Sequence, residues 1–330
     1  MTALARPGCR FVAILFTLIG VGACREQEGP GAKWQVWPDA PIRFIVPFAP
    51  GGPADSIARL VGDNMGAYLG QPVIIDNRAG SGGNIGTALA AKAAADGYTV
   101  LVTTSAFAVN VSLFEDPGYD AGKDFIPTAL LATQPNAILV NASLPAKTLA
   151  DLFALAKTQK LGFATPGNGT TPHLTGEQVF RAHGKLDMVA VHFKGAAPAV
   201  VAIASGQPPV GAAAISTPLP YIRTGRLRAL AVSSARRIAA LPDVPTLAEA
   251  GIADVEDYTW VGLFLPAGTP PAIVQRLNEA ANRAIQSPDV RARLDALVFE
   301  PVGGTPQAFA GHVRDEIAKW GKIVREGHLR

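Results

Sequence analysis

The stretch IRFIVPFAPGGPADSIARLVGDNMGAYLG, residues 42–70, decides the fold. Its first part, Ile42–Phe48, is rich in β-branched and aromatic residues and predicts a strand that closes at a turn over residues 49–53. A helix follows, because apolar residues then recur at a spacing of three or four, Asp55 or Ser56 can cap its start, and Gly70 can end it. The stretch therefore predicts a strand and a helix joined by a Gly-rich loop.

Units of this kind recur along the chain. Further strands are predicted at Val73–Ile75, Tyr98–Thr104, Ile138–Val140, Leu161–Thr165, Met188–Phe193, Val210–Ala214, Ala229–Val232 and Trp260–Leu265. Helices are predicted from Asn84 and over Leu149–Thr158, Pro271–Gln286, Pro288–Leu297 and Pro306–Arg325, and Thr148 with Asp151 fits a capping box. Strands that alternate with helices predict an α/β fold built on parallel sheet.

The first 23 residues predict an export signal. Arg6 and Arg10 precede the apolar run Phe11–Val21, which is well short of the roughly 20 residues that cross a bilayer. The tetrapeptide Val21-Gly-Ala-Cys24 resembles a bacterial lipobox, which would leave Cys24 lipidated, whereas ordinary cleavage near Ala23 is the alternative. Either reading places the mature protein outside the cytoplasm, with residues 24–37 as a tether.

Composition limits the classes of function. The 330 residues are 48% hydrophobic and 17% charged, which suits one large globular domain or two. The formal net charge is +3 and no run of Lys and Arg exceeds the pair Arg236–Arg237, so the pattern of a nucleic-acid binder is missing. The two cysteines are Cys9 and Cys24. We therefore expect no disulfide, cysteine nucleophile or cysteine metal site in the folded part.

Four glycine-containing joints are candidate anion sites. A loop between a parallel strand and a helix exposes the first N–H groups of the helix, and the helix dipole favours negative charge there. The carboxyl ends of the strands lie at one edge of an open α/β sheet, so such loops can converge on one crevice, although each could equally be a plain turn. The joints are Gly51-Gly52, Gly80–Asn84, Gly167–Thr170 and Lys194-Gly195.

Catalytic motifs are missing from the sequence. It has no nucleophile elbow, zinc-protease or P-loop motif, and its five histidines are scattered without ligand spacing, so no metal or cofactor is expected. Gly80, Gly82 and Gly86 do not have the spacing of a dinucleotide fingerprint. His173, at a helix start, could contact a ligand or make a structural hydrogen bond, and Lys194 could meet an anion or be solvated.

Several blocks of sequence together resemble the solute receptors of tripartite tricarboxylate transporters, also called the Bug family. The resemblance spans roughly residues 38–327. It rests on Ile45–Arg59, Asn77–Gly86, Asp96–Thr99, Pro166–Thr170 with His173, Phe193–Gly195, Leu227–Val232, Leu241–Thr246, Pro266–Pro270 and Glu300–Gly304.

The resemblance implies a type II periplasmic binding protein fold, in which two α/β lobes joined by two crossovers close over a ligand cleft. From the order of elements, the crossovers fall near Thr133–Pro135 and Asp257–Tyr258, so that lobe 1 holds 38–134 and 258–330 and lobe 2 holds 135–257. The joints and the resemblance together give the expected ligand-binding residues: Phe48, Ala49, Gly51, Gly52, Asn84, Ser105, Asn168, Gly169, Thr170, His173, Lys194 and Gly195.

Two positions depart from the family pattern. Ala213 stands where the family commonly has an aspartate at a strand end, and Phe193 stands where Tyr is common. A carboxylate at position 213 could meet an ammonium group, so its absence favours a ligand with only negative or neutral groups.

The family implies a receptor that binds a small carboxylate and delivers it to membrane permease subunits or signals its presence, without catalysing a reaction. We expect it in the periplasm, held by lipid at Cys24. The alternatives are a secreted α/β hydrolase, for which no nucleophile and base are found, and a structural envelope protein with a degenerate cleft.

Overall fold

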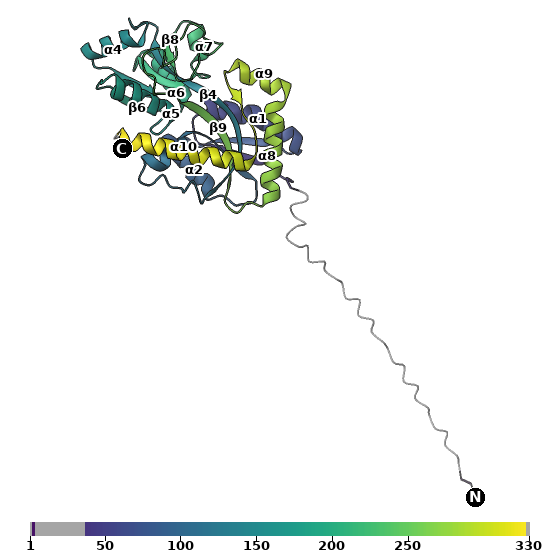
Figure 1. The fold of residues 1–330 in the computed structure, drawn as a ribbon. Coiled ribbons are helices and arrows are strands. Elements are labelled where there is room, and N and C mark those ends of the chain that lie inside the picture. Colours follow the sequence, from purple (N-terminus) through teal and green to yellow (C-terminus); the bar gives the residue numbers. More distant parts are fainter. Residues whose placement is uncertain (1, 4–36, 328–330) are drawn as a thin grey trace.

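Two α/β lobes make up the folded part of this computed structural model, which describes residues 2–3 and 37–327 (Figure 1). Apart from residues 2–3, the expected export signal lies outside the described residues, as do Cys24 and the tether up to residue 36. Strand β4 (Phe125–Asn141) runs from one lobe into the other beside β9 (Tyr258–Pro266). Within 37–327, none of the helices combines the length and the apolar character that a bilayer crossing needs.

Lobe 1 is built on a mixed sheet. Strands β1 (Ile42–Val46), β2 (Val73–Asn77) and β3 (Thr99–Thr104) are parallel, β9 lies antiparallel between β3 and β4, and β10 (Glu300–Pro301) pairs with β4. The helices of this lobe are α1 (Pro53–Leu69), α2 (Asn84–Ala91), α3 (Ala106–Leu113), α8 (Pro271–Gln286), α9 (Pro288–Ala296) and α10 (Pro306–Glu326), with a 3₁₀ turn at Ser81–Gly83.

Lobe 2 repeats this plan. Strands β5 (Gly162–Thr165), β6 (Val189–His192) and β7 (Val210–Ala214) are parallel, and β7 and β8 (Leu227–Val232) pair antiparallel with the second half of β4. The helices are α4 (Leu149–Thr158), α5 (Thr171–Glu177), α6 (Ala196–Ser205) and α7 (Leu219–Arg223). Helix α5 continues into a π-helical segment, Gln178–His183.

Strand β4 changes partners at one point. Its last pair with β9 is Pro135 with Tyr258, and its first pair with β7 is Asn136 with Ala214. The carboxyl ends of the parallel strands of both lobes consequently face the same interlobe space, where the loops that follow β1, β3, β5 and β6 meet.

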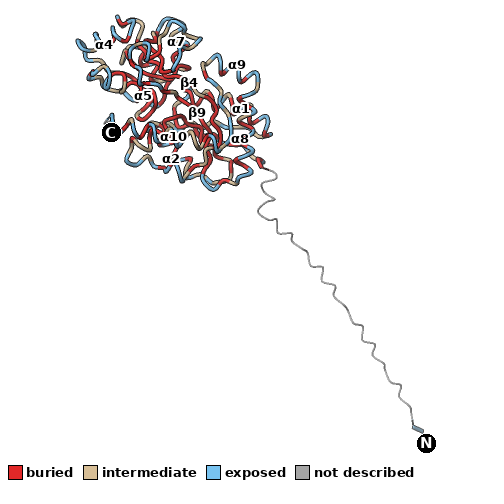
Figure 2. The backbone as a smooth tube through the Cα atoms, viewed as in Figure 1, coloured by how far each residue is buried: buried red, intermediate tan, exposed pale blue. Residues whose placement is uncertain are grey.

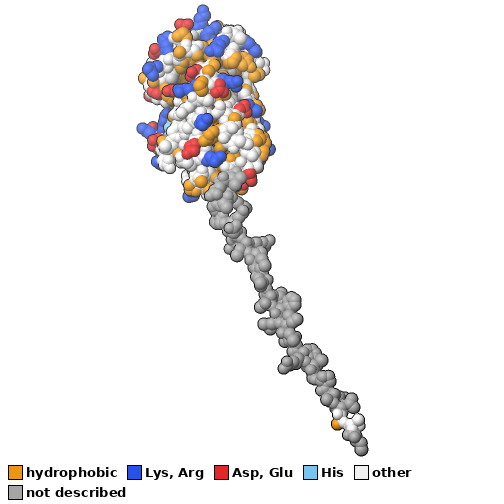
Figure 3. Space-filling model, turned by 90° about the vertical axis from the view of Figure 1, so that its right-hand side faces the viewer, with side chains coloured by type: hydrophobic (Ala, Val, Ile, Leu, Met, Phe, Trp, Pro, Cys, Tyr) orange, Lys and Arg blue, Asp and Glu red, His pale blue; other side chains and the backbone are white. Residues whose placement is uncertain are grey.

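Each lobe has its own apolar core (Figure 2). In lobe 1 the strands bury Phe44 and Val46 against Ile57 of α1, while Trp320 of α10 is fully buried against α3. In lobe 2 Phe163 and Phe180 pack edge to face at 5.0 Å. On the face shown in Figure 3, basic and acidic side chains are interspersed, so no patch of one sign dominates that face.

Many predicted elements are confirmed. Helices α4 and α8 have the predicted bounds, Gly70 caps α1 in the left-handed conformation, and the Thr148–Asp151 capping box forms. One assignment was wrong: neither Asp55 nor Ser56 is the N-cap of α1, because the helix begins at Pro53 with Gly52 before it. Proline is favoured in the first turn because its missing N–H has no intrahelical partner there.

The structure also differs from the prediction of a parallel sheet. The sheet is mixed, because β4, β8, β9 and β10 run antiparallel to their neighbours. The predicted strand Ile138–Val140 is only the end of β4. The first part of β4 was not predicted, because it contains Pro127 and Pro135 and proline argues against a strand. The strand accommodates Pro127 with a shift of register after that residue. Helix α3 was missed because its apolar residues do not follow an amphipathic period.

Candidate functional site

A small cavity lies between the lobes, at the carboxyl ends of the strands. Its volume is about 30 Å³, room for roughly two water molecules. The lining residues are Phe48, Gly52, Pro53, Ala54 and Thr104 from lobe 1, Pro166, Thr170, Pro172, Ala196 and Ala214 from lobe 2, and Thr259 from β9.

Three helices begin at this cavity. The first residues of α1, α5 and α6 all contribute to the lining. The N–H groups in each first turn have no intrahelical acceptor, and Pro53, Pro172 and Pro198 contribute no N–H of their own. The positive ends of their dipoles therefore point at one space. No Asp, Glu, Lys or Arg is among the lining residues, so an anion here would be held by N–H groups and by the Thr104 hydroxyl. The hydroxyls of Thr170 and Thr259 already donate to Gly167 and Asn136.

Asp55 organises the lobe 1 loop of the site. This buried carboxylate accepts hydrogen bonds from the Gly51 N–H at 2.9 Å, the Asn77 Nδ2 at 3.0 Å and the Arg59 guanidinium at 3.0 Å. Burial alone would raise its pKa, but the hydrogen bonds from Arg59, Gly51 and Asn77 together lower the pKa below its usual value. Because Asn77 also donates to the Phe48 carbonyl, the β1–α1 loop is held from both sides.

Two histidines lie beside the lobe 2 loop, His173 buried and His192 partly exposed to solvent. The Gly169 N–H donates to Nδ1 of buried His173 at 3.3 Å, and the opposite nitrogen of His173 lies 3.7 Å from Glu177. The His192 ring packs edge-on against His173 at 4.7 Å and hydrogen-bonds Thr165 at 2.9 Å. Desolvation, reinforced by His173, lowers the pKa of His192 to about 4, so its imidazole is neutral at pH 7.

A chain of buried hydroxyls links the cavity to the strands that cross between lobes. Ser105 Oγ lies 3.0 Å from Thr171 Oγ1, which lies 2.8 Å from Thr259 Oγ1, and Thr259 donates to Asn136 at 2.7 Å. Asn136 Nδ2 in turn donates to the carboxylate of Asp257, whose pKa burial raises. These bonds join Ser105, at the start of α3, to α5, β9 and β4, so residues of both lobes share one network.

Some of the expected site residues line the cavity and the others lie around it. Phe48, Gly52 and Thr170 line the cavity. The others surround it: Ala49 donates its N–H to the Lys194 carbonyl across the lobes at 2.8 Å, Gly51 bonds Asp55, Ser105 joins the hydroxyl chain, and His173 supports Gly169. Asn168 and Gly195 also lie where the two lobes meet, Asn84 accepts a hydrogen bond from Asn110 within lobe 1, and the Lys194 side chain is exposed.

Sequence reasoning missed several lining residues. Pro53, Ala54, Pro166, Pro172 and Ala196 sit at the same Gly-rich joints, so the joints themselves were the available signal. Thr104 ends strand β3, next to the expected site residue Ser105, but Thr259 and Ala214 lie on strands and carry no local signal. Ala213, the position of the missing aspartate, is fully buried on β7 opposite Ala137. Among the residues described, no group of three His, Cys, Asp or Glu side chains could hold a metal.

Residues 57–329 match the protein family described as the tripartite tricarboxylate transporter family receptor. Protein BugT of Bordetella pertussis is 35% identical over 316 residues, 94% of this chain and 97% of that protein. A protein encoded between tcbD and tcbE in Pseudomonas sp. strain P51 is 38% identical over 300 residues, 90% of this chain and 89% of that protein.

Solved structures resemble the whole folded part. A structure described as a periplasmic transporter has a TM-score of 0.86 and 37% identity, with 89% of this chain and 99% of the other covered. Rpa4515 of R. palustris with adipate has a TM-score of 0.85 and 34% identity, covering 88% and 98%. MatC of Rhodopseudomonas palustris with bound malate has a TM-score of 0.84 and 35% identity, covering 87% and 100%.

Proposed function

The chain belongs to the tripartite tricarboxylate transporter receptor family, and from that premise we propose that its interlobe cavity binds a small dicarboxylate. One observation carries this proposal: three helix N-termini meet at a cavity whose lining has no charged side chain. Such a site stabilises carboxylate oxygens through N–H groups and dipoles. The relatives solved with adipate and malate support the same ligand class.

The expected ligand-binding residues act in two sets in this proposal. Phe48, Gly52 and Thr170, which line the cavity, contact the ligand directly. The remaining nine hold the loops and the lobes in place around it: Ala49, Gly51, Asn84, Ser105, Asn168, Gly169, His173, Lys194 and Gly195. With alanine at 213 and 214, no acid meets an ammonium group, which favours a ligand without one.

The lobe boundaries belong to the same proposal. The change of partners between Pro135 and Asn136 supports a division into 38–134 with 258–330 and 135–257. The lobes would separate about the β4 switch and the segment before β9 to admit the ligand, and would close again over it.

The setting follows from the family and the export segment. We place the receptor in the periplasm, where it passes its ligand to the integral membrane permease subunits of a tripartite tricarboxylate transporter and catalyses no reaction. Residues 1–23 are removed and Cys24 carries lipid, because Val21-Gly-Ala-Cys24 follows the apolar run. Mass spectrometry of the membrane fraction checks this, and a Cys24→Ser protein that is processed should leave the membrane.

The ligand class is tested by release and by rebinding. The purified protein is denatured, the freed small molecules are identified by mass spectrometry, and thermal shifts are measured with malate, adipate and the diamide of adipate. A dicarboxylate at 100 times its dissociation constant adds about 2.7 kcal/mol to the free energy of unfolding, and the diamide adds almost nothing. Equal shifts for adipate and its diamide, or release of a cationic ligand alone, would refute the proposal.

A further inference from the structure

Two glycines, one on each lobe, meet oxygen atoms of the opposite lobe. A Cβ added to Gly82, in the loop before α2, would lie 1.8 Å from the backbone oxygen of Asn168. A Cβ added to Gly169 would lie 1.9 Å from Oδ1 of Asn110 on α3. Both distances are far below van der Waals contact, so only a hydrogen atom fits at each point.

Asn110 is held rigidly where Gly169 meets it. The side chain is buried, and its Nδ2 donates to the Gly82 carbonyl at 3.0 Å and to Asn84 Oδ1 at 2.6 Å. Its own Oδ1 is buried and receives no conventional hydrogen bond from the residues described. The oxygen therefore faces the α-carbon of Gly169, an arrangement that suits a weak Cα–H···O contact.

From these contacts we propose that Gly82, Gly169 and Asn110 form a closing contact between the lobes that sets ligand affinity from outside the cavity. None of the three is a lining residue of the cavity. The inference rests on the proposed function, since it treats the cavity as the ligand site. Its physical content is steric: a single methyl group at either glycine holds the lobes apart, and the open form lacks the second wall of the site.

The effect on affinity follows from the closed population. Apparent affinity falls in proportion to the fraction of molecules that can reach the binding form. If a substitution lowers that fraction from about one half to one twentieth, the dissociation constant for the ligand rises about tenfold. We expect at least that change for Gly82→Ala and for Gly169→Ala.

Backbone strain needs a matched control, because both glycines have positive φ, +60° for Gly82 and +80° for Gly169. Gly70 and Gly225 have φ of +78° and +70°, and a Cβ added to either meets nothing within 4 Å. Gly70→Ala in lobe 1 and Gly225→Ala in lobe 2 therefore carry the same conformational cost without a lobe contact.

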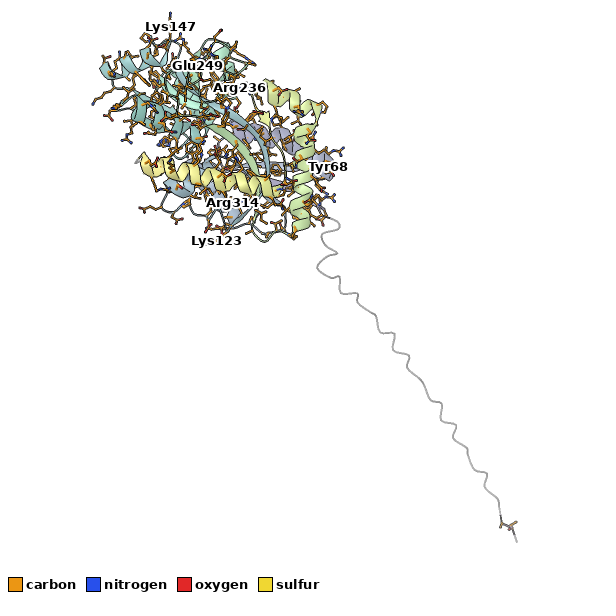
Figure 4. All side chains as sticks on the ribbon, viewed as in Figure 1. Tyr68, Lys123, Lys147, Arg236, Glu249 and Arg314 are labelled. Atoms are coloured by element: carbon orange, nitrogen blue, oxygen red, sulfur yellow. The ribbon has the colours of Figure 1, made fainter. Side chains whose placement is uncertain are left out.

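Closure is read by pulsed electron paramagnetic resonance on the mature chain with Cys24→Ser. Spin labels at Lys123→Cys and Lys147→Cys report the separation of the lobes, since these exposed residues project from opposite ends of the molecule (Figure 4). Distances are recorded without ligand and with malate and adipate, and affinities for both are measured by calorimetry. The short distance should be lost in Gly82→Ala and Gly169→Ala and kept in Gly70→Ala and Gly225→Ala.

A rescue separates the closing contact from general damage. Asn110→Ala removes the oxygen that Gly169→Ala would strike, leaving Leu113 as its next neighbour at 3.2 Å, so the double variant should regain the short distance. The same change cannot rescue Gly82→Ala, which strikes a backbone oxygen. The inference is overturned if closure survives in both glycine variants, if the rescue is not selective, or if the parent never shows a short distance. If the distances respond as expected but neither acid binds, the ligand class alone is wrong.

Discussion

Replacing Asp55 with Asn should destabilise the protein and weaken ligand binding together. The substitution keeps the shape of a buried side chain that accepts from Gly51, Arg59 and Asn77, but it removes the charge and turns one acceptor oxygen into a donor. A hydrogen bond to a charged group contributes about 1.5–3 kcal/mol and a neutral one about 0.5–1.5.

The expected loss is about 2–3 kcal/mol of unfolding free energy. The bonds from Gly51 and Asn77 each lose about 1 kcal/mol. Arg59 adds less than 1 kcal/mol because its side chain is 52% exposed and the pair is screened by water. For a chain of this size the melting temperature should fall by about 5 °C. The dissociation constant for a dicarboxylate should rise about tenfold, since Gly51 and Gly52 are released at the cavity.

The dependence on pH identifies the charge as the cause. The folded-state pKa of Asp55 is lowered below the ordinary value of 3.8, so its stabilisation is complete above about pH 4 and is lost as pH falls through the folded pKa. The stability difference between parent and Asp55→Asn, measured by urea unfolding from pH 7 to pH 2.5, should therefore shrink below pH 4.

The control is Asp63→Asn on the same helix, an exposed residue for which a change within about 0.5 kcal/mol is expected. The reasoning fails if Asp55→Asn is no more destabilising than Asp63→Asn, or if the difference between Asp55→Asn and the parent is the same at pH 3 as at pH 7. Either result would mean that the carboxylate charge does not organise the loop.

Three further changes test other parts of the structure. Thr148→Ala removes the capping box of α4 and should cost about 1 kcal/mol in urea unfolding with dicarboxylate affinity unchanged; a variant as stable as the parent would count against the cap. His192 has a pKa of about 4 in the folded protein and about 6.5 in the unfolded chain, so the parent should lose stability as pH falls from 6.5 to 4, because only the unfolded chain is protonated there. His192→Gln should remove this loss, and an unchanged dependence of stability on pH would contradict the assignment. Asp257 has a folded-state pKa raised above 3.8, so the parent should lose stability as pH rises from about 4 towards that pKa, and Asp257→Asn should remove this slope; equal slopes would disprove it.

Several elements could be predicted because their signals are local. The start of α4 depends on Thr148 and Asp151, which are three residues apart, and the end of α1 depends on Gly70 alone. The Gly-rich joints were visible for the same reason, since a turn that exposes helix N–H groups needs glycine and proline within a few residues. These interactions are complete within one or two turns of chain, so sequence alone specifies them.

Only the tertiary structure decided which residues lie next to the Gly-rich joints. Nothing local places Thr259 beside Thr171, 88 residues away in sequence, or Gly169 against Asn110 on the other lobe. Nor does a local pattern show that β4 runs through Pro127 and Pro135, because partners distant in the chain fix its path. The sequence by itself determined an α/β protein with Gly-rich loops between strands and helices, and it predicts export and anion binding at those loops. The size of the cavity and the fit of the two lobes depend on contacts between segments far apart in the chain, which form only when both cores have packed.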